Sequence, residues 1–81
     1  MLNIKVLGSG CANCHKVEEL AKQAVAQLAV EARVALVTDM KEIMRYGVMA
    51  TPGIVINEKV VSTGRVPALS QITTMITNAL I

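Results

Sequence analysis

Aromatic residues are almost absent from this sequence of 81 residues, in which Tyr46 is the only aromatic side chain and Trp and Phe do not occur. Proteins that bind nucleic acids usually present a clustered basic surface, and those that bind single strands stack bases on aromatic side chains. The net charge is only +2 and the basic residues form no run. The sequence therefore predicts that nucleic acid is not a partner, and that the core is aliphatic.

Long apolar runs are also missing. No stretch approaches the roughly 18–20 residues of a membrane-spanning helix, and the N-terminus lacks the basic start and apolar segment of a secretion signal. We expect a cytoplasmic protein with no membrane partner, folded as one domain over residues 1–81. Two cysteines are too few for the disulfide framework of a secreted protein. Their C-x-x-C spacing, in an intracellular chain, indicates redox or metal chemistry.

Four short segments have the composition of β-strands: residues 2–7, 33–37, 53–56 and 59–62. The second is apolar after its first residue, so we predict that it is buried on both faces. The last two are separated only by Asn57 and Glu58, the spacing of a tight β-hairpin.

Three segments have features of helices. The first runs from Cys11 to about Ala29 and has an apolar stripe with helical spacing: Val17, Leu20, Ala21, Ala24, Val25 and Leu28. The last has Pro67 in its predicted first turn, and its predicted buried face contains Leu69, Ile72, Met75, Ile76, Ala79 and Leu80.

A short helix is predicted between them. Asp39 and Glu42 have the spacing of a capping box, in which each side chain bonds a backbone N–H of the other residue. Ile43 and Met44 are its predicted apolar face, and Gly47 is its predicted C-terminal stop.

The predicted order is therefore β-α-β-α-β-β-α. Two strands joined through a helix are parallel, with a right-handed crossover, whereas the last two form an antiparallel hairpin. This predicts an α/β fold in which helices flank both faces of a four-stranded mixed sheet.

Cys11 and Cys14 lie where the first strand gives way to the first helix. The first N–H groups of a helix have no partner within it and carry partial positive charge, so a thiolate there is stabilised and the thiol pKa falls below about 8.5. Cys11 is at the outer position, which predicts the nucleophile. Cys14 is within the first turn, which predicts a more buried, resolving thiol. His15 and Lys16 add positive charge nearby, a weaker electrostatic contribution.

Together, the Gly-Ser-Gly-Cys-Ala-Asn-Cys segment, the helices, Thr51-Pro52-Gly53 and the hairpin resemble the small thioredoxin-like, glutaredoxin-sized redox proteins of bacteria and archaea, of the redox-active disulfide protein 2 type. The resemblance covers Leu2 to Leu80. It implies a thioredoxin-like fold in which Cys11 attacks, Cys14 resolves and the Thr51–Pro52 bond is cis. Thr51 would then offer its backbone to a substrate peptide as an added strand.

The resemblance further implies a thiol–disulfide oxidoreductase that reduces or exchanges protein disulfides, needs no bound cofactor, and is itself reduced by a reductase, for which a flavin-dependent enzyme is one candidate. The sequence departs from thioredoxins proper at three places. Gly10 replaces the aromatic residue before the first cysteine, Ala12-Asn13 replaces Gly-Pro, and Val6-Leu7 stands in the stretch that usually carries a buried acid.

Three alternatives remain open from the residues alone. A soft-metal carrier would bind Cu(I) or zinc through Cys11 and Cys14, although copper-chaperone domains end in a strand and zinc prefers four ligands. Residues 11–15 also match C-x-x-C-H, the signature of covalent haem attachment. Haem attachment requires export of the protein, and cytochromes with this signature have a helical fold. A non-catalytic interaction module would not need the cysteines.

Overall fold

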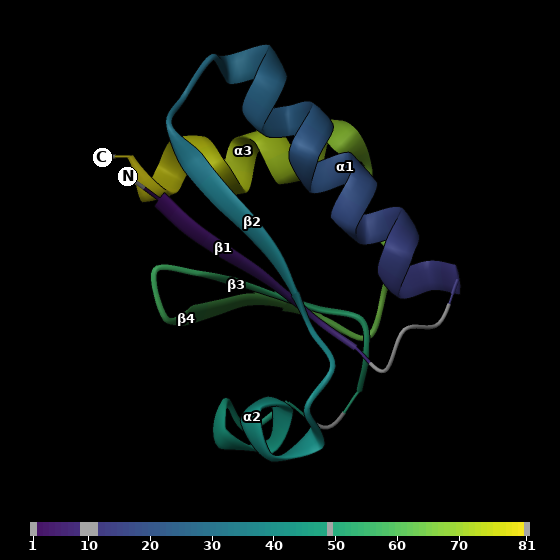
Figure 1. Cartoon of the computed structure of the whole chain (residues 1–81). Coiled ribbons are helices and arrows are strands. Elements are labelled where there is room, and N and C mark those ends of the chain that lie inside the picture. Colours follow the sequence, from purple (N-terminus) through teal and green to yellow (C-terminus); the bar gives the residue numbers. More distant parts are fainter. Residues whose placement is uncertain (1, 9–11, 49, 81) are drawn as a thin grey trace.

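The computed structural model describes residues 2–8, 12–48 and 50–80. The chain forms, in order, β1 (Leu2–Leu7), α1 (Ala12–Leu28), β2 (Ala32–Val37), α2 (Met40–Arg45), β3 (Gly53–Ile56), β4 (Lys59–Thr63) and α3 (Leu69–Ala79) (Figure 1). The predicted order of strands and helices is confirmed.

The four strands form one mixed sheet in the order β2-β1-β3-β4. β1 is parallel to β2 and antiparallel to β3, and β3 is antiparallel to β4. The prediction that the second strand is buried on both faces is wrong, because β2 lies at an edge of the sheet. Its residues are half-buried and Arg33 is exposed. An apolar run of this length did not distinguish an edge strand from a central one.

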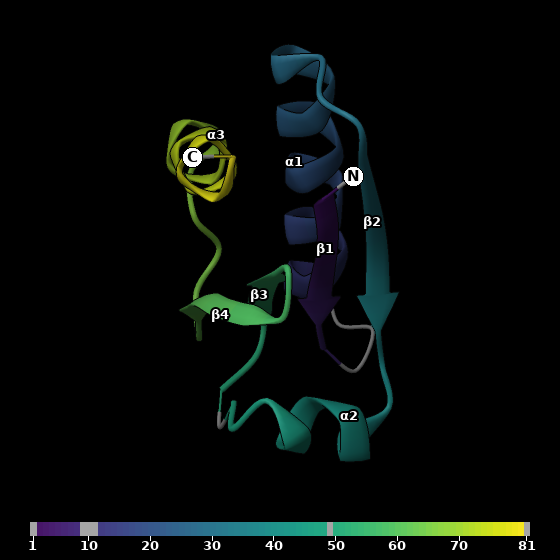
Figure 2. The ribbon, with the colours of Figure 1, turned by 90° about the vertical axis from the view of Figure 1, so that its left-hand side faces the viewer.

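The helices cover the sheet unequally, with α1 and α3 on one side and α2 on the other (Figures 1 and 2). Alternate side chains of β1 separate the two cores, as the pleat of a strand requires. Ile4 and Val6 pack with residues of α1 and α3 in the larger core. Leu7 packs in the smaller core beside α2, with Ile43, Val48 and Val55.

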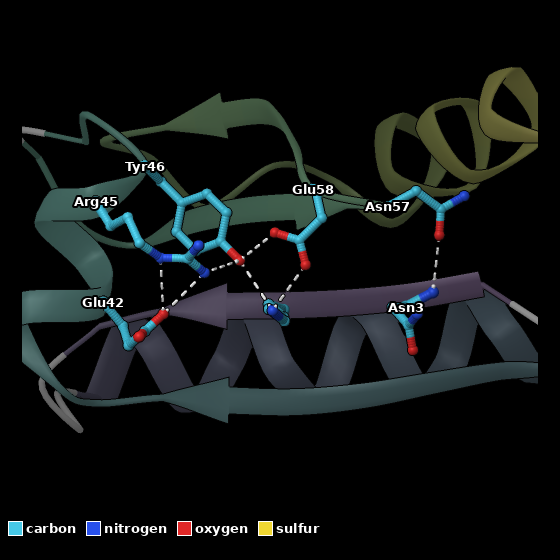
Figure 3. Close-up of polar contacts among 7 residues, drawn as sticks. Asn3, Glu42, Arg45, Tyr46, Asn57 and Glu58 are labelled. Atoms are coloured by element: carbon cyan, nitrogen blue, oxygen red, sulfur yellow. Dashed lines mark hydrogen bonds and ion pairs between the residues drawn. The ribbon is translucent and has the colours of Figure 1, made fainter.

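The turn between β3 and β4 is as short as predicted. Asn57 and Glu58 have φ angles of +50° and +69°, which is the backbone conformation of a type I′ hairpin turn. Asn57 is also fixed from outside the hairpin. Its side-chain Oδ1 accepts a hydrogen bond from the Asn3 N–H at 3.0 Å, and its own N–H donates to the Asn3 carbonyl at 2.8 Å. The turn therefore lies against the first residues of β1 (Figure 3).

α2 differs from the prediction at two residues. Asp39 caps its N-terminus by accepting from the Lys41 N–H at 2.9 Å, but Glu42 pairs with Arg45 at 3.0 Å, so the capping box is only half formed. Ile43 is buried as predicted, whereas Met44 is 69% exposed, because a helix of six residues has room for one inward-facing position against this small core. Gly47 has a φ angle of +73° and ends the helix as predicted.

α3 begins later than predicted. Leu69 is its first residue and Ala68 is its N-cap, whose N–H donates to Gln71 Oε1 at 2.9 Å. Pro67 is buried ahead of the cap, so it is not part of the first turn. Leu80 follows the end of the helix and is 52% exposed, so the prediction that it belongs to the buried face is wrong. Ile72 and Ile76 carry that face as predicted.

Candidate active site

Cys14 is the third residue of α1, and its side chain is completely buried. The segment that leads to it starts where β1 ends at Leu7, and the Gly8 N–H donates to the Val37 carbonyl at 2.9 Å, extending the contact with β2 by one residue. The prediction that Cys14 is buried in the first helical turn is confirmed. Cys11 lies outside the described residues, so its predicted position at the helix start remains a prediction.

Gly8 is in direct contact with Cys14. A Cβ atom built on Gly8 would overlap Sγ of Cys14 and would lie 2.9 Å from its Cβ, closer than real side chains approach one another. The side chain of Cys14 therefore fits against residue 8 only because glycine has no side chain. The sequence shows that Gly8 breaks the strand, but spacing alone does not reveal which side chain fills the space beside it.

The first turn of α1 contains no acidic residue. The partial positive charge of the helix N-terminus is therefore not neutralised from within that turn. His15 and Lys16 are both exposed. His15 Nδ1 lies 3.7 Å from Glu18 Oε1, and Lys22 Nζ lies 3.8 Å from the other oxygen of the same carboxylate. Glu18 thus lies between His15 and the ammonium group of Lys22 on the surface of α1.

Thr51 and Pro52 lie at the same end of the sheet as Gly8. Leu7 pairs with Gly53 across the antiparallel strands β1 and β3, so Gly8, which follows Leu7, and Pro52, which precedes Gly53, come from facing strand ends. The Thr51–Pro52 peptide bond is cis. Thr51 is exposed and Pro52 is buried. The structure therefore brings the Thr51–Pro52 peptide to the strand end that leads into Cys14.

Gly64, which directly follows β4, forms a backbone hydrogen bond with Pro52. Its N–H donates to the Pro52 carbonyl at 2.9 Å, and its φ angle of +75° is one that glycine tolerates best. A Cβ atom on Gly64 would lie 3.2 Å from Cβ of Ala50, which is a tight contact. The end of β4 therefore fixes the carbonyl of Pro52.

The surroundings of the site are apolar. Val6 and Leu7, in the stretch where thioredoxins proper carry an acid, are both completely buried. In the described part of the chain, no charged or polar residue is buried, and no three His, Cys, Asp or Glu side chains lie close enough together to bind a metal ion. Over those same residues, no helix combines the length and apolarity needed to cross a membrane.

A second group of polar side chains was missed by sequence reasoning. We call it the Tyr46 cluster and define it as Lys5, Glu42, Arg45, Tyr46 and Glu58 (Figure 3). The Tyr46 hydroxyl donates to Glu58 Oε2 at 2.6 Å and accepts from Lys5 Nζ at 2.9 Å. Lys5 Nζ also lies 3.0 Å from Glu58 Oε1. One signal was available in the sequence: Glu58 follows Asn57 where a type I′ turn favours glycine.

The hydrogen bonds of this cluster shift the pKa values of Glu58 and Lys5. The hydrogen bond from Tyr46, followed by the one from Lys5, lowers the pKa of Glu58 below its ordinary value. The hydrogen bonds to Tyr46 and Glu58 raise the pKa of Lys5. Both groups are thus held in their charged forms.

A mixed four-stranded sheet, a buried cysteine in the first turn of the helix after β1, and a cis proline at the facing strand end are together the features of a thioredoxin fold. A family model described as a thioredoxin domain matches residues 2–77, so the chain belongs to this thioredoxin family.

Two archaeal relatives are each called thioredoxin. The one from Methanocaldococcus jannaschii is 35% identical over 72 residues, which cover 89% of this chain and 83% of that protein. The one from Methanothermobacter thermautotrophicus is 33% identical over 72 residues, covering 89% of this chain and 94% of that protein. The chain also resembles the crystal structure of Deadhead, a germline-specific thioredoxin of Drosophila melanogaster. The TM-score is 0.69 with 17% identity, over 95% of this chain and 79% of that one, which shows the fold.

These matches confirm the predicted resemblance and fold class. The protein is a thiol–disulfide oxidoreductase that acts on protein disulfides. The soft-metal carrier finds no support among these relatives.

Proposed function

We propose that Cys11 is the nucleophile and Cys14 the resolving cysteine of a single thioredoxin-like domain over residues 1–81. The observation that carries this proposal is the complete burial of Cys14 in the first turn of α1, against Gly8. A buried thiol cannot reach a protein disulfide from solvent, but it can attack a neighbouring sulfur atom. In the sequence, Cys11 directly precedes α1, the position at which unpaired helix N–H groups stabilise a thiolate.

The first step is the attack of the Cys11 thiolate on one sulfur atom of the substrate disulfide. The Cys11–substrate S–S bond forms as the substrate S–S bond breaks, and the displaced substrate sulfur leaves as a thiolate that takes a proton from water. The electron pair of the broken bond leaves with the displaced sulfur, and the protein is joined to its substrate by a mixed disulfide.

The second step is the attack of Cys14 on the Cys11 sulfur atom. The thiol of Cys14 loses its proton, the Cys11–Cys14 bond forms, and the second substrate thiolate departs and is protonated. The substrate has gained two electrons and two protons. The protein has lost two electrons and the proton of Cys14, and water has supplied the other proton. Return to the dithiol form therefore requires a reductase as the electron donor, for which we propose a flavin-dependent enzyme; the domain itself would carry no cofactor.

The substrate would lie along the peptide of Thr51 and Pro52. Thr51 is exposed and Pro52 is buried, so the polypeptide of a substrate would meet the backbone of Thr51 while Pro52 shapes the site beneath it. His15 and Lys16 would contribute positive charge through solvent. We place this activity in the cytoplasm, with neither nucleic acid nor membrane as a partner.

Reduction of insulin disulfides by dithiothreitol tests this assignment. The Cys11→Ser protein should show only the uncatalysed rate, because no thiolate remains at the helix start. The Cys14→Ser protein should accumulate a mixed disulfide with insulin that is visible by mass spectrometry without reductant. Full activity of the Cys11→Ser protein would overturn the proposal.

A further inference from the structure

We infer that three members of the Tyr46 cluster, Lys5, Tyr46 and Glu58, position Thr51 and Pro52 for protein substrates. This inference rests on the proposed role of those two residues. Lys5, Tyr46 and Glu58 are positioning residues in this proposal, since they act through the backbone and need not touch the substrate. The central member is the only aromatic side chain of the chain.

The cluster joins three separate elements of the fold. Lys5 comes from β1, Tyr46 directly follows α2, and Glu58 lies in the turn between β3 and β4. Figure 3 shows the Tyr46 hydroxyl between the Glu58 carboxylate and the groups that donate to it. Arg45 forms the outer side of the cluster, where it binds Glu42 and approaches the Tyr46 hydroxyl at 3.4 Å.

The Tyr46 hydroxyl uses all of its hydrogen-bonding capacity here. A phenol has one donor and two acceptor sites. The donor is given to Glu58 at 2.6 Å, and the acceptors face Lys5 at 2.9 Å and Arg45 at 3.4 Å. The ring is fixed as well, because Lys5 Nζ lies 5.5 Å and Arg45 Cζ 5.0 Å from its centroid, within the range of cation–π attraction. The side chain of Tyr46 is therefore restrained at both its hydroxyl and its ring.

The bond between Tyr46 and Glu58 closes a loop of chain that contains Thr51 and Pro52. The two bonded residues are 12 positions apart. Closing a loop of this length reduces the positions that its residues can reach. Within the loop, Val48 is anchored in the core cluster with Leu7 and Val55, and Pro52 is anchored by Gly64. The cluster thus joins the two ends of the loop, and Val48 and Pro52 are held within it on either side of Thr51.

Glu58 supports a role beyond local turn formation. Its φ angle of +69° is unfavourable for a residue with a Cβ atom, and Asn-Gly is the preferred pair for this turn. A local preference that is given up in this way often marks a functional requirement. Here the carboxylate of Glu58 is the group that glycine would lack, and it is the group that binds Tyr46 and Lys5.

Three variants test the inference, with insulin as the protein disulfide and 5,5′-dithiobis(2-nitrobenzoate) as a small disulfide that needs no backbone docking. Tyr46→Phe removes only the hydroxyl and Glu58→Gln only the charge. Glu42→Gln is the matched control, because its partner Arg45 is in the same helix and its loss does not open the loop. Tyr46→Phe and Glu58→Gln should raise KM for insulin roughly threefold or more, because a smaller fraction of molecules holds Thr51 correctly. Their rates with the small disulfide should equal that of the unmodified protein.

Glu58→Gly separates positioning from stability. Glycine relieves the unfavourable turn conformation, so the urea midpoint should not fall, while KM for insulin should rise as in Glu58→Gln. The hydrogen-exchange rate of the Gly64 amide, which donates to Pro52, should rise in Tyr46→Phe, Glu58→Gln and Glu58→Gly. It should not rise in Glu42→Gln. The exchange of the Ile72 amide, in α3, should stay constant and so report that the fold is intact.

The inference is overturned if insulin KM is unchanged in Tyr46→Phe and Glu58→Gln, if both disulfides slow in parallel, or if Glu42→Gln has the same effect. Those outcomes leave the proposed function standing as long as Cys11→Ser remains inactive. An active Cys11→Ser protein would instead remove the proposed function, whatever the Tyr46 variants do.

Discussion

Gly8 and Cys14 touch so closely that the sulfur of Cys14 occupies the space in which any other residue at position 8 would carry its Cβ atom. Both residues are buried. Gly8 is fixed to β2 by its hydrogen bond to Val37, and Cys14 is fixed by α1, so neither can move away freely. The sulfur of Cys14, the proposed resolving thiol, therefore fits here only because residue 8 has no side chain.

Gly8→Ala should displace the sulfur of Cys14 and slow the resolving step more than the first attack. Overpacking of this kind costs about 1–3 kcal/mol of stability, which urea denaturation will measure. In single-turnover reactions with insulin, the mixed disulfide at Cys11 should persist longer than in the unmodified protein. Gly53→Ala is the matched control, because its new Cβ atom would meet Val48, Ser62 and Leu7 at ordinary distances of 3.4–3.6 Å. Equal lifetimes in both variants would contradict this account.

Gly64→Ala should weaken both the fold and the placement of Pro52. Alanine at a φ angle of +75° is strained, and its Cβ atom would approach Ala50 at 3.2 Å. We expect a loss of about 1–2 kcal/mol in the free energy of unfolding, together with a raised KM for insulin. In Gly47→Ala, the φ angle is nearly the same at +73° but the space is open. That control should lose stability through strain alone and keep its KM. A raised KM in both would show that strain, and not the contact at Ala50, matters.

The Tyr46 cluster predicts a pH dependence of stability on the acid side. The pKa of Glu58 is lowered in the folded protein, first by its hydrogen bond from Tyr46 and then by that from Lys5. The stabilisation is therefore fully present above the pKa of the unfolded chain, ordinarily 4.5, and is lost as the pH falls through the lower, folded value. Urea midpoints measured at about pH 6 and about pH 3 should differ more for the unmodified protein than for Glu58→Gln. The same difference in both proteins would contradict the assignment.

His15 and Lys16 should have a small effect on the thiol through solvent. Both are exposed, so their charges are screened within a Debye length of about 8 Å at physiological salt. Replacing both by Gln should slow alkylation of Cys11 by iodoacetamide at neutral pH by no more than roughly twofold, with a smaller effect at high salt. Lys22→Gln, two turns further along α1, is the control for lost charge and should leave the rate unchanged. An effect of ten times or more would mean that these side chains act at close range.

The order and type of the elements followed from the sequence because the signals were local. Apolar residues at helical spacing predicted α1 and α3, and two polar residues between apolar runs predicted the hairpin. The errors concerned burial, at residues whose exposure depends on their position in the folded protein and not on the local sequence pattern. Arg33 and its neighbours form an edge strand, and Met44 faces solvent because a helix of six residues offers one inward position.

Only those parts of the candidate site that form motifs along the sequence were predictable. The spacing of Cys11 and Cys14 indicated a dithiol, and the family resemblance indicated Thr51 and Pro52. The contact between Gly8 and Cys14 depends on how β1 meets α1 in space. The bond between Tyr46 and Glu58 depends on how α2 packs against the hairpin. Neither relationship has a signature in spacing along the chain, so only three-dimensional structure reveals them.

The most direct measurement is a titration of the Cys11 thiol in the Cys14→Ser protein, followed by thiolate absorbance in the ultraviolet. With one thiol present, the curve reports Cys11 alone. The helix N-terminus of α1, which has no acidic residue in its first turn, predicts a pKa clearly below the value of about 8.5 for an unperturbed cysteine. A pKa at or above about 8.5 would contradict the central claim that unpaired backbone amides of α1 stabilise the attacking sulfur.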